Sequence, residues 1–204
     1  MPAAIDYYFS PVSPWSYLGH TRFREIAGRA GARINVKPVD YGRIFPASGG
    51  LPLKQRPAQR QAYRLMELAR WREHLAVPLT IEPKFFPVSP DAAAKLIVAA
   101  DVACGGEAAL DLALALMRAC WSEERNLADA ATLDAIVVAS GLDPAALREV
   151  AVAADAQAKY DLYTDEAMAR GVFGAPTYAI GEELFWGQDR LDFVARALVP
   201  SSIR

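Results

Sequence analysis

The sequence predicts a mixed α/β fold in which a single four-stranded sheet is built from both ends of the chain. Residues 1–40 show a strand, helix and strand pattern, and residues 171–204 show two short strands and a helix. Between them, residues 41–170 are mostly helical and rich in alanine. Since a strand–helix–strand unit implies parallel strands, we expect the two ends to form one sheet domain. The segment 41–170 is then an inserted all-helical subdomain within one continuous globule.

The first unit begins with residues 4–10, a run rich in Tyr, Phe and Ile that is typical of a strand. A helical pattern follows from Pro14 to about residue 29, and Gly31 ends it. Residues 33–39 alternate with period two and predict the second strand. These three elements make up the expected parallel unit.

The inserted block contains two segments predicted as loops and several predicted as helices. Residues 41–56 and 77–90 are punctuated by proline and glycine, so we expect both to be loops. Between them, residues 58–75 predict a helix. The residues expected to face inward on that helix are Ala58, Ala62, Leu65 and Ala69. Further helices are expected over residues 91–104, 107–124, 129–140, 143–154 and 157–170.

Short strands return near the end of the chain. Residues 171–177 lead into a strand at 178–180, and a tight turn at 181–183 precedes a return strand at 184–186. This spacing predicts a β-hairpin. The last helix is expected to begin near Gly187, with Asp189 as its N-cap.

Composition argues against several classes of function. The chain has 204 residues and a formal net charge of −2, so it has no basic footprint for nucleic acid or an anionic membrane. We find no secretory signal and no apolar run long enough to cross a membrane, and we expect a cytoplasmic protein. Cys104 and Cys120 form no CxxC pair, and His20 and His74 lie on separate predicted helices. No metal site is therefore expected.

The junction between the first strand and the first helix is the most informative stretch. Ser13 is placed to cap the helix, and Pro14 suits the first helical position, where a backbone N–H has no intrahelical partner. A helix start has free N–H donors and a partial positive charge, so a thiolate, carboxylate or phosphate is favoured beside Ser13. A helix cap with no further role is the alternative interpretation.

Motifs from the two ends relate the chain to a known fold. Ser13-Pro14-Trp15-Ser16 follows the first strand, and Gly174-Ala175-Pro176-Thr177 precedes the hairpin. With the order of elements, they resemble the thioredoxin fold with a helical insertion, as in DsbA-like proteins, where a CxxC motif and a proline occupy these places. Serines stand here where both cysteines would be, so dithiol oxidoreductase chemistry is excluded. Together with residues 171–177 and 185–191, these motifs resemble the 2-hydroxychromene-2-carboxylate isomerases and the related kappa-class glutathione transferases.

The resemblance implies a thioredoxin-like four-stranded mixed sheet with a large helical insertion, and an isomerase of aromatic degradation. It also implies glutathione as the cofactor, with its sulfur at Ser13, where the hydroxyl and the helix start lower the pKa of the thiol. In the family the thiolate adds to the conjugated substrate and leaves again, so glutathione is not consumed. A kappa-like glutathione transferase and a non-catalytic thioredoxin-fold binding module are the alternatives. Because the family is commonly dimeric, we expect a homodimer.

The resemblance also assigns glutathione-binding roles near the end of the chain. Ala175 is expected to offer its backbone N–H and C=O to the cysteinyl part, which requires a cis bond between Ala175 and Pro176. The γ-glutamyl end is expected at four consecutive residues, Trp186, Gly187, Gln188 and Asp189. Asp189 suits the ammonium group, and its alternative role is that of an N-cap only. Arg190 is expected either to pair with a carboxylate of this chain or to contact the ligand.

The implied substrate is a small aromatic carboxylate, and its candidate contacts are Phe45, Gln55, Arg56 and Phe86. Arg56 suits a carboxylate because its guanidinium is a planar fork, and Lys54 is a second cation nearby. A solvated loop cation is the alternative for Arg56. Phe45 and Phe86, with Phe85, are expected either to wall the aromatic ring or to belong to the core.

Overall fold

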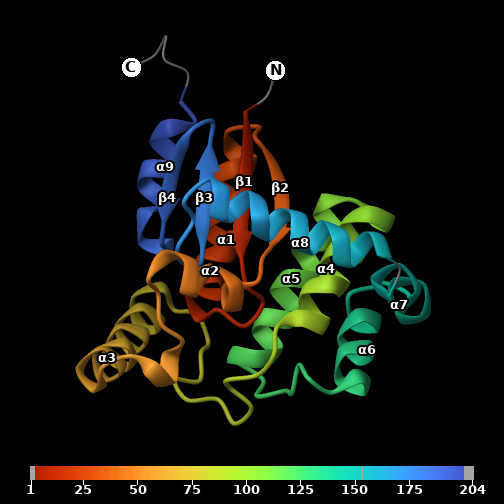
Figure 1. Ribbon diagram of the computed structural model, residues 1–204, viewed down its shortest axis with the longest axis horizontal. Helices are drawn as coiled ribbons and strands as arrows, with labels where there is room; N and C mark the ends of the chain where they lie inside the picture. Colours follow the sequence, from red (N-terminus) through yellow and green to blue (C-terminus); the bar gives the residue numbers. More distant parts are fainter. Residues whose placement is uncertain (1–2, 153, 200–204) are drawn as a thin grey trace.

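The structure, a computed structural model, describes residues 3–152 and 154–199. A four-stranded sheet in the order β2-β1-β3-β4 forms its centre (Figure 1). The strands are β1 (Ala4–Phe9), β2 (Arg33–Pro38), β3 (Thr177–Ile180) and β4 (Glu183–Trp186). β1 pairs with β2 in parallel and with β3 antiparallel, and β3 pairs with β4 antiparallel. The predicted mixed sheet, which joins the two ends of the chain, is therefore confirmed.

Successive side chains of β1 point alternately to the two faces of the sheet. Ile5, Tyr7 and Phe9 face α1 (Pro14–Arg29) and α9 (Leu191–Ala197), in the larger core cluster. The ring of Tyr7 stacks on Phe9, with centroids 4.3 Å apart, and on Tyr178, with centroids 5.5 Å apart. Tyr8 points the other way and packs in a second cluster. This alternation is the period-two pattern of a strand buried on both faces.

The opposite face is covered by α2 (Tyr41–Ser48) and α8 (Ala154–Ala169), with α8 crossing in front of the strands in Figure 1. Tyr41 and Ile44 of α2 are buried there together with Ala167 of α8. Both helices belong to the inserted segment and yet pack directly on the sheet. The division of the chain into a sheet domain and an inserted subdomain stays a prediction.

The rest of the inserted segment forms helices on one side of the sheet and one helix that stands apart. The bounds are α3 (Ala58–Leu75), α4 (Asp91–Cys104), α5 (Gly106–Trp121), α6 (Ala130–Ala139) and α7 (Pro144–Val152). A 3₁₀ turn, η1 (Leu53–Gln55), precedes α3. α4 and α5 pair closely and supply most of the alanines of the larger core cluster, together with four of its leucines. α3 lies at the lower left of Figure 1, away from this bundle.

Residues 41–48 were expected in a loop, and the structure corrects this prediction. The segment forms α2 in spite of Pro46, because Asp40 accepts a hydrogen bond from the Gly42 N–H at 2.7 Å and Gly49 ends the helix with φ of 74°. The helix is also held by burial of Ile44 and by the Tyr41 hydroxyl, which donates to the carbonyl of Gly174 at 2.8 Å. Local breakers are thus outweighed by packing on the sheet.

Three smaller expectations are also wrong. Ala58 and Ala62 of α3 are exposed and do not face inward, because α3 packs on the core only through its later part, where Leu68 is buried. α8 begins at Ala154, a few residues before the expected start. Asp189 does not cap the last helix: it lies in a 3₁₀ turn, η2 (Gln188–Arg190), and α9 starts after Arg190 without a side-chain cap.

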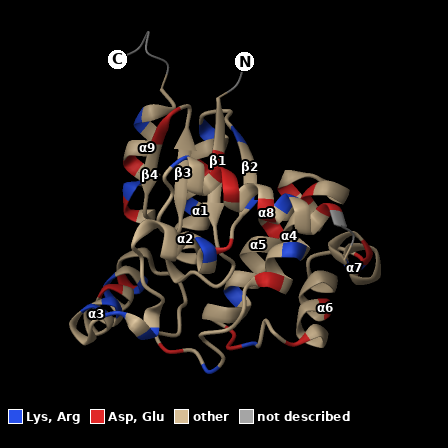
Figure 2. Cartoon of the chain, viewed as in Figure 1, with Lys and Arg blue, Asp and Glu red and all other residues tan. Residues whose placement is uncertain are grey.

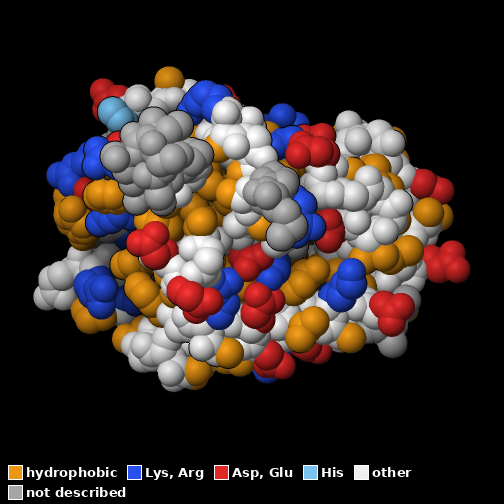
Figure 3. All heavy atoms as spheres, turned by 90° about the horizontal axis from the view of Figure 1, so that it is seen from above, with side chains coloured by type: hydrophobic (Ala, Val, Ile, Leu, Met, Phe, Trp, Pro, Cys, Tyr) orange, Lys and Arg blue, Asp and Glu red, His pale blue; other side chains and the backbone are white. Residues whose placement is uncertain are grey.

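Charged side chains of both signs are interspersed over the chain in Figure 2 and over the face shown in Figure 3. In the described part of the chain, no helix is long and apolar enough to cross a membrane. The same residues contain no group of three or more His, Cys, Asp or Glu side chains that could hold a metal ion.

Candidate active site

The two motifs lie at the same edge of the sheet. Tyr8, near the end of β1, is paired with Thr177, at the start of antiparallel β3. The chain that leaves β1 toward Ser13 and the chain that enters β3 through Pro176 therefore meet at one edge. Pairing of distant strands thus explains why segments more than 160 residues apart can build one site.

Ser13 is the N-cap of α1, as predicted. Its side-chain oxygen accepts a hydrogen bond from the Ser16 N–H at 3.2 Å, and Pro14 occupies the first helical turn. The hydroxyl hydrogen of Ser13 has no acceptor among the described residues. Ser13 is half-buried, whereas Ser16 is fully buried and its hydroxyl has no partner within the described chain. Ser13 can therefore donate a hydrogen bond to an anion, and Ser16 has no access to one.

The turn before β3 presents free backbone groups. The Ala175-Pro176 peptide bond is cis, as predicted, and the Pro176 carbonyl accepts from the Gly187 N–H at 2.9 Å. Neither the N–H nor the C=O of half-buried Ala175 has a hydrogen-bond partner among the described residues. A buried or half-buried backbone group without a partner is uncommon, so these groups suit an extended ligand segment.

Trp186 forms an exposed aromatic wall beside this turn. Its side chain is 52% exposed, and its ring lies 4.7 Å from that of Phe173. A Cβ atom built on Gly174 would meet the Trp186 indole nitrogen, so only glycine permits this position of the indole. The glycine before Ala175 therefore leaves the space that the tryptophan occupies.

Of the residues after Trp186, Gln188 is buried and supports the fold, whereas Asp189 is exposed. Gln188 is buried, and its side-chain oxygen and backbone carbonyl both accept from the Arg22 guanidinium, the latter at 2.8 Å. Its side chain is thus held against α1, and the expected role of Gln188 at the γ-glutamyl end stays a prediction. Exposed Asp189 forms an ion pair with Arg190 at 2.6 Å, which is the local pairing expected as one alternative. The backbone N–H groups of Gln188 and Asp189 have no acceptor in the described part of the chain.

These elements line a cavity with a volume of about 480 Å³ between the sheet edge and α3. From the predicted set, it brings together Ala175, Trp186, Gly187, Gln188, Asp189 and Arg56. Ser13 and Pro176 are not in its wall, but Trp15, in the first turn of α1, is. Its size fits a ligand of a few hundred daltons. The cavity thus joins the motif elements of the sheet to the inserted helix.

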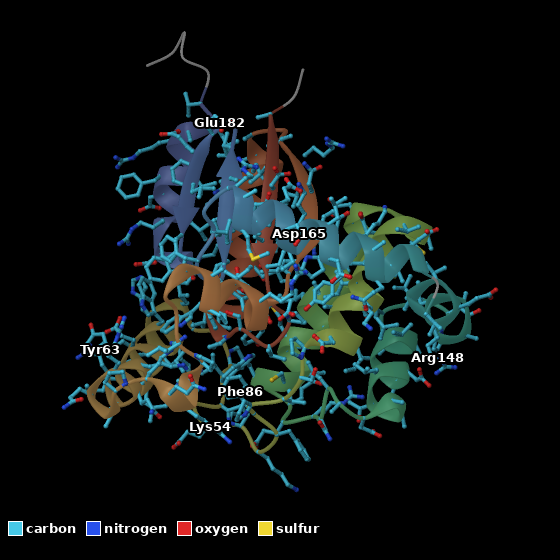
Figure 4. The ribbon with its side chains drawn as sticks, viewed as in Figure 1. Lys54, Tyr63, Phe86, Arg148, Asp165 and Glu182 are labelled. Atoms are coloured by element: carbon cyan, nitrogen blue, oxygen red, sulfur yellow. The ribbon has the colours of Figure 1, made fainter. Side chains whose placement is uncertain are left out.

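The other substrate candidates lie outside this wall. Gln55 is exposed, and Phe45 packs on Tyr41 at 5.4 Å, with the Arg56 guanidinium 5.7 Å above its ring. Phe86 packs on Trp121 of α5, with ring centroids 4.7 Å apart. Figure 4 shows Phe86 between α3 and the end of α5, with Lys54 below it and Tyr63 on α3. Phe45 and Phe86 therefore contact the residues that support the cavity.

The side of the cavity formed by α3 was not predicted. It consists of Gln59, Arg60, Tyr63, Arg64, Glu67 and Trp71. These residues form two rows with a spacing of four, one continuing from Arg56 and the other ending at Trp71. Residues four apart share a helix face, so this polar and aromatic stripe was the available signal. Because the alanines of this helix were expected to face inward, the polar and aromatic stripe was expected to face solvent.

Arginines dominate the charge of this wall. Arg56, Arg60 and Arg64 lie along one stripe, and Figure 2 shows the basic segments of α3. None of the three forms an ion pair with a described residue. Burial, with the neighbouring charge of Arg60, lowers the pKa of Arg56 below its usual range. Burial and the charge of Arg56 lower the pKa of Arg64 to about 10. The charge of this wall is therefore suited to an anion.

A larger cavity, of about 860 Å³, lies along β2, the outer strand of the sheet, between that strand and residues of α1 and α5. It contains none of the predicted site residues. Arg24 in its wall is paired with Glu107 at 2.8 Å and with Asp111 at 2.6 Å. The smaller cavity is the candidate active site, because it joins the motif residues to unpaired cations.

Comparisons with known proteins agree with this architecture. Residues 4–199 match the model of a DSBA-like thioredoxin domain. A 2-hydroxychromene-2-carboxylate isomerase from Sphingobium xenophagum is 31% identical over 200 residues, which are 98% of this chain and 100% of that protein. A solved structure of a 2-hydroxychromene-2-carboxylate isomerase superposes with a TM-score of 0.76 at 29% identity, over 96% of this chain and 94% of that one.

A partial similarity extends to a second group. Glutathione S-transferase kappa 1 of Caenorhabditis elegans is 32% identical over 82 residues, which are 40% of this chain and 36% of that protein. The full-length matches and the family model cover the sheet, the inserted helices and both motifs. The chain therefore belongs to the DSBA-like thioredoxin domain family and, within it, to the family of 2-hydroxychromene-2-carboxylate isomerases.

Proposed function

We propose that this protein is a glutathione-dependent isomerase of 2-hydroxychromene-2-carboxylate, with Ser13 stabilising the thiolate of glutathione. The names of its full-length relatives support the reaction. The observation that carries the proposal is the cavity itself. One space is lined by the first turn of α1, by the free backbone of Ala175 and by the arginines of α3. A bound thiol and an aromatic acid can therefore meet there.

The residues present fit glutathione. The free N–H and C=O of Ala175 can pair with the cysteinyl backbone as an added strand does. The N–H groups of Gln188 and Asp189 suit a carboxylate, and the Asp189 side chain suits an ammonium group. In this arrangement Trp186 would hold the γ-glutamyl part, and Ser13 would serve the sulfur.

When bound, glutathione would supply a nucleophilic thiolate for the conjugated substrate and would not be consumed. Ser13 donates its hydroxyl hydrogen to the sulfur, and the free N–H groups at the start of α1 add partial positive charge. Both favour thiolate over thiol and so lower the pKa of the bound thiol. The arginine stripe holds the substrate as an anion, and the aromatic residues of the wall exclude water.

The test is a turnover assay with a trace of glutathione. Purified protein is given 2-hydroxychromene-2-carboxylate in large excess over glutathione, and product and free thiol are measured at the end. We expect many turnovers per glutathione with the thiol concentration unchanged. Stoichiometric loss of thiol with a stable conjugate would instead make the protein a kappa-like glutathione transferase. Retention of glutathione without turnover would make it a binding module, and turnover without thiol would refute the proposal.

A further inference from the structure

Arg64 is the innermost cation of the candidate active site and has no anionic partner in the part of the chain that the structure describes. It lies on α3 in the wall of the 480 Å³ cavity. No side chain of the described residues forms an ion pair or hydrogen bond with its guanidinium. Glu82, which attracts it at longer range, is exposed to solvent. A half-buried charge without a partner is costly, and this cost is relieved when an anion binds.

Two aromatic rings hold the guanidinium in place. Its central carbon lies 5.4 Å from the ring centroid of Phe86 and 5.7 Å from that of Trp121. Trp121 is fully buried and donates its indole N–H to the carbonyl of Val12, one residue before Ser13, at 3.3 Å. The position of Arg64 is thus fixed relative to the start of α1. A cation over aromatic faces keeps its charge and loses little freedom on binding an anion.

The other two arginines of the stripe are less suited to binding an anion inside the cavity. The Arg56 side chain already donates to the carbonyl of Leu51 at 2.8 Å, and its guanidinium lies over Phe45. Arg60 is exposed to solvent. Since the pKa of Arg64 is lowered only to about 10, Arg64 is protonated at neutral pH. Arg64 alone combines full charge, partial burial and donors with no partner.

We propose that Arg64 is the specificity-determining residue that binds the carboxylate of a flat aromatic acid in this cavity, with Phe86 and Trp121 positioning its guanidinium. This inference rests on the proposed function, because it names the group that recognises the substrate of the same site. It assigns Phe86 a supporting role beneath Arg64 in place of direct contact with the substrate. Arg56 then guides the acid from the outer part of the stripe.

The experiment measures equilibrium binding, which does not depend on turnover. Chromone-2-carboxylate, a flat acid that cannot isomerise, and its uncharged carboxamide are titrated by calorimetry into wild-type protein and variants. The variants are Arg64→Gln, Arg64→Lys and Arg56→Gln, and Arg148→Gln is the control. Arg148 is ion-paired with Asp134 on the far side of the molecule, as its place in Figure 4 shows. Glutathione binding and thermal melting confirm that each variant is folded.

Removal of a charge-assisted hydrogen-bonding pair is expected to weaken carboxylate binding by roughly 10- to 100-fold in Arg64→Gln, with carboxamide binding changed by less than about threefold. Arg64→Lys should be intermediate because it keeps the charge and loses the planar fork. Arg56→Gln should lose less than Arg64→Gln, and Arg148→Gln should match the wild type. If Arg64→Gln does not fold, the carboxylate preference of Arg64→Lys decides the same question.

Three results would overturn the inference. They are unchanged carboxylate binding in folded Arg64→Gln, equal losses for acid and amide, and a larger loss in Arg56→Gln. Failure of the proposed function looks different. If turnover does not require glutathione while Arg64→Gln still binds the acid more weakly and the amide normally, the glutathione mechanism is refuted and the role of Arg64 is supported. If turnover requires glutathione without consuming it and Arg64→Gln binds the acid normally, the proposed function is supported and the role of Arg64 is refuted.

Discussion

Replacing Ser13 by alanine should lower stability slightly, through loss of the helix cap, and activity much more, through loss of the hydrogen-bond donor. The hydroxyl oxygen accepts the Ser16 N–H at 3.2 Å, so its loss removes an N-cap, at a cost of about 1 kcal/mol in the free energy of unfolding. In a chain of 204 residues that cost lowers Tm by roughly 2–4 °C. The fold is retained, because the sheet and the α4–α5 core are untouched.

The loss of activity should be larger than the loss of stability. Ser13 is proposed to donate one preorganised hydrogen bond to a thiolate, and removal of one such donor costs roughly 10²–10³ in rate. This corresponds to about 2.7–4 kcal/mol, well above the contribution of the cap. The assay is kcat/KM for isomerisation at saturating glutathione, with Tm measured on the same preparations.

Two control variants separate the cap from the donor. Ser16→Ala removes a buried hydroxyl that has no partner within the described chain, so activity should stay within about threefold and stability should not fall. Ser13→Asp keeps an acceptor for the cap but places a carboxylate beside the sulfur, so Tm should be retained while activity is lost. Equal activity losses in Ser13→Ala and Ser16→Ala, or a fully active Ser13→Asp variant, would refute the assignment of Ser13.

Further predictions concern other parts of the chain. Buried His20 is bonded to Leu110 O at 3.0 Å, and burial lowers its pKa from 6.5 to about 3. The unfolded chain therefore takes up the proton first, and the free energy of unfolding should fall by about 1.6 kcal/mol from this group as pH drops from 6.5 to 5. A flat urea-unfolding profile there would contradict this. Burial raises the pKa of Cys120 to about 12, so a thiol reagent should label exposed Cys104 in the native protein and both cysteines after unfolding. Gly174→Ala should displace the Trp186 indole and weaken retention on glutathione resin, with Tm lowered by only a few degrees.

The sheet and the first helix could be predicted because their local signals and their packing agree. The run around Tyr7 has strand composition and is buried on both faces, and Ser13 with Pro14 forms the predicted helix start. The segment of α2 shows the opposite case. Asp40 and Gly49 are capping signals, but Pro46 argued against a helix, and only the packing of the segment on the sheet decided the outcome.

The α3 side of the cavity could not be predicted, because it depends on where the helix lies relative to the sheet. The four-residue spacing of Arg56, Arg60 and Arg64 was visible in the sequence. A stripe of this kind normally faces solvent, and only the fold places it opposite Ala175 and Trp186. The roles assigned to these residues, and the homodimer, stay predictions that binding assays and light scattering can test.

The most direct test of the account is the pKa of the glutathione thiol while it is bound. It can be measured by following the ultraviolet absorbance of the thiolate as the pH of the complex is raised. We expect the bound thiol to ionise below the value of a free thiol, near 8.5, in the wild type and to return toward that value in Ser13→Ala. A bound thiol that ionises like free glutathione, or that ionises identically in both proteins, would contradict the proposal that Ser13 stabilises the thiolate.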